Sequence, residues 1–424
     1  MEKLIERTIF QEIKQHLTDK EITVIIGARQ VGKTTLLLHL KDYLISQKKI
    51  SSERIFYFNL DRLKDLAFFS EQEEVIKFLE TRKNFGTIFL LVDEAQRIPN
   101  AGRFFKGIYD LDLPVKIVLT GSSSLELKAK FQEPLTGRKR IFYLWPLSLM
   151  EVIKWKEPGL KEIIEKTKTI SQYDLEKIQK IEEELVIFGG YPRIVIEKNE
   201  QKKIKFLEEI YNSYLEKDII NFLKIKKPLI FNKLVSYLAN QICQLVNLDE
   251  LSNSIGVERK TIEHYLNILE QTFIIKLLSP YFKNPRKELV KMPKVFFIDN
   301  GLRNFALGNF NSFKERLDKG AVLENFVANE LLKKIFPPHS LHYWRTLHKA
   351  EVDFIIRYGD GRVVPIEVKA TMLKKKKISR SYGYFIKEYQ PRKGYLVNLS
   401  LKGEEKMGRT KISFIYPYEL IMSV

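Results

Sequence analysis

Residues 27–34 read GARQVGKT, which fits the phosphate-binding pattern GxxxxGK[ST]. Gly27 and Gly32 allow the backbone N–H groups to wrap around phosphates, and the helix expected after them adds its positive N-terminus. Lys33 would reach the β- and γ-phosphates, and Thr34 would bind Mg²⁺. We therefore expect ATP and Mg²⁺ to be bound by Gly27, Ala28, Arg29, Gln30, Val31, Gly32, Lys33, Thr34 and Thr35.

Two further polar groups follow apolar runs that are typical of buried strands. Asp93 and Glu94 come directly after the run 88–92. Asp93 would hold Mg²⁺ through its second coordination shell, and Glu94 would polarise the attacking water. The run 115–119 ends in TGSSS, where Ser122 could position the water beside the γ-phosphate. The next two serines could equally cap a helix.

A second set of chemically capable residues lies near the C-terminus. Glu367 and Lys369 in VVPIEVK would point to one face of a strand. A tight hairpin over 358–362 would bring Asp353 of AEVDFII beside them. Asp353, Glu367 and Glu324, the last from a helical stretch, would hold Mg²⁺, and Lys369 would stabilise a pentavalent phosphate. Glu351 on the same strand face could simply pair with a lysine.

The segment 247–278 has the pattern of a helix-turn-helix, with helices at 248–254 and 258–270 around Gly256. Arg259 and Lys260 at the exposed start of the second helix suit DNA phosphates and base edges. The runs 273–281 and 294–298, with a basic segment 283–291 between them, would form a wing. Such modules also serve as lids or protein-binding domains. Lys374 and Lys375 could grip phosphates or belong to a solvated loop.

These residues require four kinds of scaffold. Strands at 23–26, 55–58, 88–92, 115–119 and 140–144, with helical patterns between them, predict a parallel sheet covered on both faces. We expect four domains: an ATPase core over 1–150, a helical lid over 151–225, a winged helix-turn-helix over 226–311 and a nuclease-like domain over 312–424.

Composition narrows the class of protein. Hydrophobic residues make up 44% of the 424 residues, which excludes disorder and coiled coils. A single cysteine, Cys243, excludes a disulfide scaffold and fits a cytoplasmic location. The longest apolar stretch, 141–150, is far short of the ~20 residues of a membrane helix. A net charge of +19 favours a polyanionic partner, although solvated lysine-rich faces would give the same balance.

Taken in order, GARQVGKTTLL, LLVDEAQRIPN, LTGSSSLEL and LTGRKRIFYLWPLSLMEV resemble the prokaryotic AAA-type ATPases of the archaeal-ATPase clade. That resemblance implies a strand inserted between the phosphate-loop strand and the Asp-Glu strand. It also implies that Arg138 is a finger reaching a neighbour's γ-phosphate, and that Pro192 packs on the adenine. The C-terminal signature of Asp353, Glu367 and Lys369 resembles the PD-(D/E)XK restriction-endonuclease-like fold, except that Val352 stands where a proline is usual.

The expected fold class is therefore α/β: a P-loop AAA-type sheet with a helical lid, a winged helix-turn-helix and a restriction-endonuclease-like domain. One hypothesis is an ATP-hydrolysing, ring-like homo-oligomer that acts on duplex or branched DNA and carries a metal-dependent nuclease-like domain. The alternative is an ATP-controlled switch that binds DNA or a partner protein without cleaving DNA.

Overall fold

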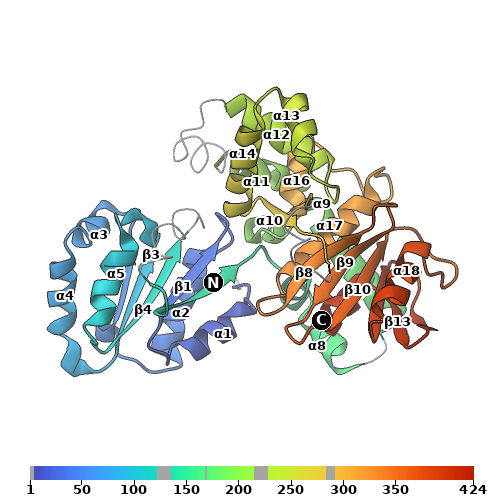
Figure 1. Ribbon diagram of the computed structural model, residues 1–424. Coiled ribbons are helices and arrows are strands. Elements are labelled where there is room, and N and C mark those ends of the chain that lie inside the picture. Colours follow the sequence, from blue (N-terminus) through green and yellow to red (C-terminus); the bar gives the residue numbers. More distant parts are fainter. Residues whose placement is uncertain (1–3, 122–134, 168–169, 214–227, 283–291) are drawn as a thin grey trace. The chain divides into compact units, whose positions relative to one another are not determined.

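The structure, a computed structural model, describes residues 4–121, 135–167, 170–213, 228–282 and 292–424 (Figure 1). The chain forms two compact units. Unit 1 comprises 1–147 with 271–273, and unit 2 comprises 148–270 with 274–424. The finer division of unit 2 into lid, winged helix and C-terminal domain stays a prediction. No helix in the described part of the chain is long and apolar enough to span a bilayer.

Unit 1 is a five-stranded parallel sheet in the order β2-β3-β4-β1-β5 (Figure 1). All five expected strands form: β1 (Ile22–Gly27), β2 (Ile55–Asn59), β3 (Ile88–Asp93), β4 (Val115–Gly121) and β5 (Lys139–Leu144). Because β1 and β3 are buried along their whole length, both faces of the sheet are covered. The inserted strand that the resemblance implied is β4, which lies between β1 and β3.

Helices connect these strands, as parallel pairing requires. The α-helices of unit 1 are α1 (Ile9–His16), α2 (Lys33–Ser46), α3 (Leu63–Phe68), α4 (Gln72–Glu80) and α5 (Ala101–Asp110). The helix α2 contacts β1, β3 and β4, so it is fixed against the centre of the sheet. Its N-terminus therefore lies directly after β1, where the glycine-rich segment turns.

Unit 2 begins with helices and then alternates between strands and helices. Its helices are α7 (Leu149–Lys156), α8 (Pro158–Lys166), α9 (Gln172–Phe188), α10 (Pro192–Ile196), α11 (Glu200–Ser213), α12 (Pro228–Asn240), α13 (Leu248–Ile255), α14 (Arg259–Gln271), α16 (Asn300–Leu307), α17 (Lys319–Leu332), α18 (Arg380–Tyr389) and α19 (Pro417–Ser423). The two strands expected to form a wing pair antiparallel as β6 (Ile275–Leu278) and β7 (Lys294–Phe297).

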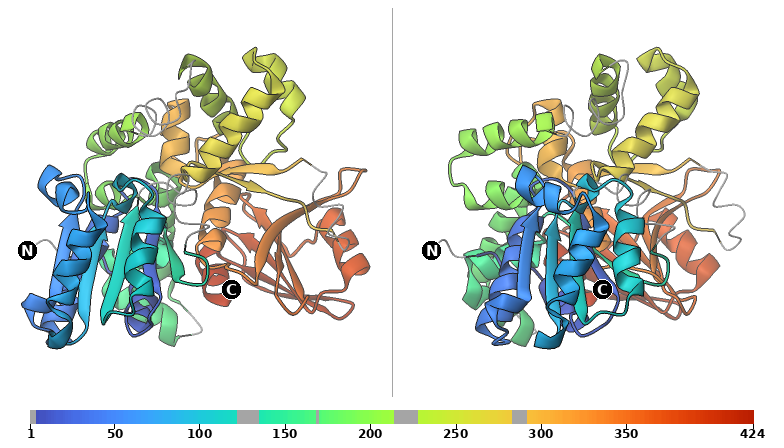
Figure 2. Two further views of the ribbon diagram at one scale, coloured as in Figure 1. Left: turned by 60° about the vertical axis from the view of Figure 1, so that its left-hand side comes forward. Right: turned by 90° about the vertical axis from the view of Figure 1, so that its left-hand side faces the viewer.

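A six-stranded mixed sheet forms the C-terminal part, in the order β12-β13-β11-β10-β9-β8. Its strands are β8 (Ser340–Arg345), β9 (Glu351–Arg357), β10 (Val363–Lys369), β11 (Lys393–Asn398), β12 (Gly403–Met407) and β13 (Thr410–Ile415). The helices α17 and α18 pack against it at β10 and β9 respectively (Figure 2). The hairpin expected at 358–362 is present, closed by Tyr358 N donating to Arg362 O at 2.8 Å.

Three buried asparagines join the segments of unit 2. Asn304 donates to the carbonyls of Val186 and Ile187 at the end of α9, at 3.0 and 2.8 Å. Asn325 on α17 exchanges two hydrogen bonds with the backbone of Phe297. Asn300 donates to the carbonyls of Val186 and Val322 and accepts from the amide of Asn325. Side-chain amides therefore satisfy backbone groups that would otherwise be buried unpaired.

Candidate nucleotide and charged-cluster sites

The glycine-rich segment forms the turn between β1 and α2. Gly32 adopts a left-handed conformation with φ of +97° directly before α2. A Cβ atom at Gly27 would lie 2.1 Å from the carbonyl oxygen of Leu144, so the close approach of β5 permits only glycine there. The backbone N–H groups at the start of α2 lie at the carboxyl end of the sheet, where a phosphate can accept from them.

The Lys33 side chain folds back over this turn. Its ammonium group donates to the carbonyl oxygens of Gly27 and Ala28, at 3.0 and 2.7 Å, and only 5% of the residue is exposed. The positive charge is thus fixed at the turn itself.

Asp93 is the centre of a hydroxyl network at the end of β3. The Thr34 hydroxyl donates to Asp93 Oδ2 at 2.7 Å, and the Thr120 hydroxyl donates to Oδ1. The Tyr57 hydroxyl lies 3.4 Å from Oδ2; burial and the Asp93 charge raise the pKa of Tyr57 to about 12. Asp93 itself is 0% exposed. Thr34 and Asp93 offer the oxygen ligands that Mg²⁺ prefers, so this pair fits a magnesium ion beside a nucleotide.

Glu94 has a backbone conformation that is rare for a non-glycine residue, with φ of +56°. Its N–H donates to the Thr120 hydroxyl at 3.2 Å, and its carboxylate accepts from the Gln96 amide. Thr120 therefore connects both acidic residues, whereas sequence reasoning singled out only Ser122 from this segment, to position the attacking water. Ser122 lies outside the described residues. The signal available in the sequence was the position of Thr120 at the very end of an apolar strand.

Arg138 lies at the amino ends of the strands, opposite the end of the sheet that carries the glycine-rich turn. It directly precedes β5, and its carbonyl accepts from Ile22 N at the start of β1. Five residue steps along β1, roughly 16 Å, separate that end from the glycine-rich turn. Arg138 Nε pairs with Asp110 at 2.8 Å. The side chain cannot reach the turn of its own chain, and its role toward a neighbour stays a prediction.

Pro192 begins α10, after a turn made by Gly189 and Gly190. Gly190 N donates to Asp299 Oδ2 at 2.7 Å, and a Cβ at Gly189 would lie 2.0 Å from Asp299 Oδ1. The glycine at position 189 is therefore explained by the close approach of Asp299, whose pKa burial raises. Contact of Pro192 with adenine stays a prediction.

The two helices expected at 248–254 and 258–270 form as α13 and α14, with Gly256 in the left-handed conformation between them. Arg259 is ion-paired with Asp249 at 3.3 Å and with Glu263 at 3.1 Å, so two carboxylates already occupy its guanidinium. Lys260 is exposed at the start of the same helix. The basic segment 283–291 lies outside the described residues. Lys374 and Lys375 are exposed in the loop between β10 and α18.

Near the C-terminus, Asp353 and Glu367 meet as expected. The register Ile366↔Phe354 sets Glu367 opposite Asp353 on neighbouring antiparallel strands, so both project from the same face. Asp353 Oδ2 accepts from Val368 N at 2.7 Å. Glu367 pairs with Lys369 at 2.6 Å and accepts from the Ser379 hydroxyl at 3.0 Å.

A buried lysine that sequence reasoning missed joins this face. Lys294 Nζ lies 2.5 Å from Glu351 Oε1 and 3.3 Å from Glu324 Oε1, and its side chain is 2% exposed. Arg345 pairs with the other oxygen of Glu351 at 2.7 Å. The pairing of Glu351 with a lysine is thus confirmed. The available signal was a lysine at the edge of an apolar strand, KVFF.

Charge and burial oppose each other in this cluster. Burial raises the pKa of Glu324 to about 8 and that of Asp353 to about 6, against the attraction of Lys294. Burial lowers the pKa of Lys294, but the carboxylates of Glu324, Glu351 and Asp353 outweigh it and the net change is upward. The ammonium group is therefore kept charged by its carboxylate neighbours.

The metal site expected at Glu324, Asp353 and Glu367 stays a prediction. Among the described residues, these three carboxylates do not bring one oxygen each within 4.8 Å of one another. The physical reason is that each carboxylate already has a partner within the chain: Lys294 for Glu324, Val368 N for Asp353, and Lys369 with Ser379 for Glu367.

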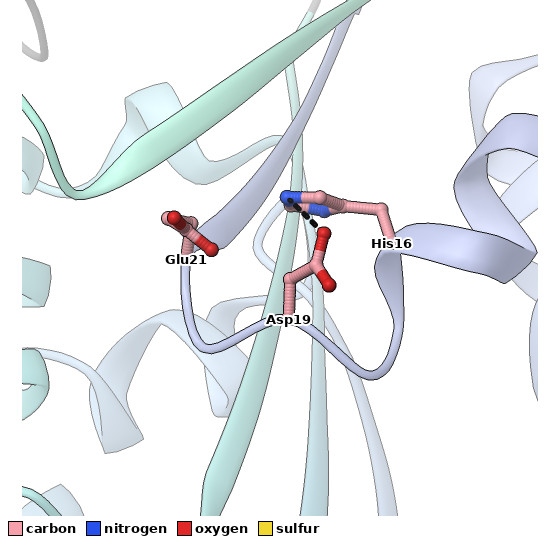
Figure 3. Close-up of side chains that lie close together, drawn as sticks. All are labelled: His16, Asp19 and Glu21. Carbon is pink, nitrogen blue, oxygen red and sulfur yellow. Dashed lines mark ion pairs between the residues drawn. The ribbon is translucent and has the colours of Figure 1, made fainter.

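The described group that meets this distance criterion is His16, Asp19 and Glu21 in unit 1 (Figure 3). The ammonium group of Lys116 already lies beside these three residues. Lys116 Nζ donates to the carbonyls of Asp19 and Glu21 at 2.8 and 2.6 Å, and lies 3.4 Å from His16 Nδ1. Burial lowers the pKa of His16 to about 4 and that of Lys116 to about 8. A lysine in this position opposes a metal cation.

Three protein families match three consecutive parts of the chain. A family described as "AAA domain" matches residues 19–153. Two families described as domains of unknown function, DUF8612 and DUF4143, match 179–312 and 319–420.

Relatives extend over most of the chain. An uncharacterized protein of Haemophilus influenzae is 30% identical over 357 residues, covering 82% of this chain and 83% of that protein. The uncharacterized protein MJ1544 of Methanocaldococcus jannaschii is 27% identical and covers 93% of this chain and 84% of that protein. Among solved structures, the ADP form of the Aeropyrum pernix ORC2 protein is 12% identical, covers 68% of this chain and 87% of that chain, and has a TM-score of only 0.35. The chain therefore belongs to the same family as the Haemophilus influenzae protein, and its first unit is an AAA-type ATPase domain.

Proposed function

We propose that this protein is an ATP-hydrolysing, oligomeric machine that acts on DNA. The observation that carries the ATPase site is the network in which Thr34 and Thr120 both donate to Asp93 while Thr120 also accepts from Glu94 N. In this proposal Lys33 neutralises the β- and γ-phosphates, Thr34 and Asp93 hold Mg²⁺, and Glu94 orients the attacking water. The expected location is the cytoplasm.

The oligomer is supported by the position of Arg138. A guanidinium at the far end of the sheet can complete a nucleotide site only on a second copy of the chain, so each working site needs two subunits. A ring is the closed arrangement that gives every subunit such a neighbour.

Action on DNA is supported by the net charge of +19 and by the helix-turn-helix with Lys260 exposed at the start of α14. Lys374 and Lys375 add charge to an exposed loop of the C-terminal part. Arg259 contributes less than Lys260 in this proposal, because its guanidinium is shared between two carboxylates.

The test combines binding with turnover. Linear, forked and four-way DNA are mixed with the protein in the presence of ATP, a non-hydrolysable analogue or no nucleotide. DNA-stimulated ATP hydrolysis, absent in Glu94→Gln, supports the proposal. ATPase turnover that no DNA changes, together with no nucleotide-dependent gel shift, contradicts the DNA part and leaves the ATPase part intact.

A second candidate function is favoured by the Lys294 contacts. It is an ATP-controlled switch whose C-terminal part binds DNA or a partner protein without cutting DNA. The carboxylates that would hold a metal for cleavage are paired within the chain instead. Nicking of DNA by wild type in Mg²⁺ or Mn²⁺, lost in Asp353→Asn, would contradict this candidate. Wild type and Asp353→Asn that are equally inert on every DNA support it.

A further inference from the structure

The buried cluster of Lys294, Glu324 and Glu351 brings together β7, α17 and β9. Two carboxylates approach one ammonium group at 3.3 and 2.5 Å, and that group is almost wholly shielded from water. Asp353, on the same strand as Glu351, adds a third negative charge that acts on Lys294. The ammonium is therefore the positive centre of an otherwise acidic face.

A divalent metal ion would need the same oxygen atoms. Mg²⁺ and Mn²⁺ bind carboxylate oxygens at about 2.1 Å, well inside the distance at which an ammonium group donates to them. The ion and Lys294 would then be cations in direct contact within a buried site. Such a pair is strongly unfavourable where water cannot screen it.

The remaining carboxylates have partners of their own within the chain. Glu367 is shared between Lys369 and the Ser379 hydroxyl, and Asp353 accepts a backbone N–H. Arg345 takes the second oxygen of Glu351. Three basic side chains, Lys294, Arg345 and Lys369, therefore offset most of the negative charge of this face.

We propose that Lys294 is a built-in cation that takes the place of a divalent metal ion at Glu324 and Glu351. The wild-type cluster then binds neither Mg²⁺ nor Mn²⁺, and the C-terminal part acts by binding rather than by metal-dependent cleavage. The statement that the C-terminal part does not cleave DNA rests on the second candidate function, whereas the statement that the cluster binds no metal ion does not. The test of metal binding uses neither DNA nor ATP, so it fails or succeeds independently of that function.

The experiment measures Mn²⁺ bound to the full-length chain without nucleotide, from the loss of the free-ion signal in electron paramagnetic resonance. Lys294→Met removes the charge but keeps the length of the side chain. We expect it to gain about one Mn²⁺ per chain, bound at least about tenfold more tightly than by wild type. Lys294→Arg keeps the charge and should gain none, and Lys294→Met with Glu324→Gln should lose the gained site.

One control variant and one alternative comparison complete the experiment. Asp19→Asn removes one carboxylate from the group of His16, Asp19 and Glu21, so any Mn²⁺ bound there is subtracted. If Lys294→Met does not fold, as judged by circular dichroism, wild type and Glu324→Gln are compared, and equal Mn²⁺ binding supports the proposal. A wild-type Mn²⁺ site that Glu324→Gln abolishes would overturn it. So would a folded Lys294→Met protein that gains no site.

Discussion

Replacing Thr120 by valine removes one hydroxyl from the centre of the nucleotide site and keeps the shape of the side chain. That hydroxyl makes two contacts: it donates to Asp93 Oδ1 and accepts from Glu94 N at 3.2 Å. Thr120 is 0% exposed, so no water replaces the lost oxygen without rearrangement. The substitution therefore leaves a buried carboxylate with one partner fewer and removes the hydroxyl that accepts from the Glu94 N–H.

The size of the effect follows from these two losses. A hydrogen bond to a charged group contributes about 1.5–3 kcal/mol, and an unsatisfied buried donor costs about 1–3 kcal/mol. Because the side chains around Thr120 can relax in part, we expect unit 1 to lose about 2–4 kcal/mol of stability. Catalysis should suffer further, because Glu94 depends on Thr120 for its backbone position. A misplaced catalytic group costs about 100-fold in rate.

The assay separates binding from turnover. Phosphate release gives kcat and KM, a fluorescent ATP analogue gives Kd, and thermal unfolding gives stability. For Thr120→Val we expect kcat to fall about 100-fold and the nucleotide Kd to change only slightly, since the phosphate turn is untouched. Thr120→Ser keeps the hydroxyl and is the matched control. A wild-type kcat in Thr120→Val, or an equal loss in both variants, would refute the reasoning.

Four other outcomes can be checked directly. Lys33→Ala should abolish tight ATP binding in a fluorescence titration, because the turn loses its main counter-charge to the phosphates; unchanged affinity would contradict the site. Mixing Arg138→Ala with Glu94→Gln chains should restore part of the ATPase rate at interfaces with one intact half of each, whereas no recovery in an oligomer that forms would count against a finger. Lys260→Ala should reduce the salt dependence of DNA affinity by about one unit of log–log slope, measured by anisotropy, and an unaltered slope would place Lys260 off the phosphates. Glu182, 4% exposed, accepts from Tyr418 N at 3.1 Å, and burial raises its pKa to about 8. Because the folded pKa lies above the unfolded value, its contribution to stability is complete below the unfolded pKa and is lost as pH rises through about 8. Glu182→Gln should therefore gain up to roughly 4 kcal/mol over wild type between pH 5 and 9 in urea unfolding, and parallel curves would refute the shift.

The parts that could be predicted from sequence are those set by local pattern. The run at 88–92 is continuously apolar and the run at 115–119 is apolar except for Lys116, which is typical of strands covered on both faces. The glycine spacing at 27–32 and the hairpin at 358–362 are equally local, because backbone conformation at glycine decides them. The positions of Asp353 and Glu367 on neighbouring strands could be predicted from that hairpin, because its length sets the strand register.

The rest depended on contacts between distant segments. Lys294 is a charged residue beside an apolar strand, and only the approach of α17 and β9 explains why it is buried. The metal site of Glu324, Asp353 and Glu367 stays a prediction, and no local pattern shows that Lys294 pairs with Glu324. Thr120 was overlooked in favour of Ser122 because a strand end can be located only to within a residue or two.

The three asparagines of unit 2 limit how the chain can be divided. Asn304 binds the end of α9, and Asn325 binds the backbone of the last residue of β7, so each expected boundary at 225 and 311 is crossed by buried hydrogen bonds. A fragment that begins or ends there would expose carbonyl and amide groups that no water reaches in the intact chain. Chimaeras between relatives should therefore be degraded in the cell when the crossover lies at either of these inner boundaries.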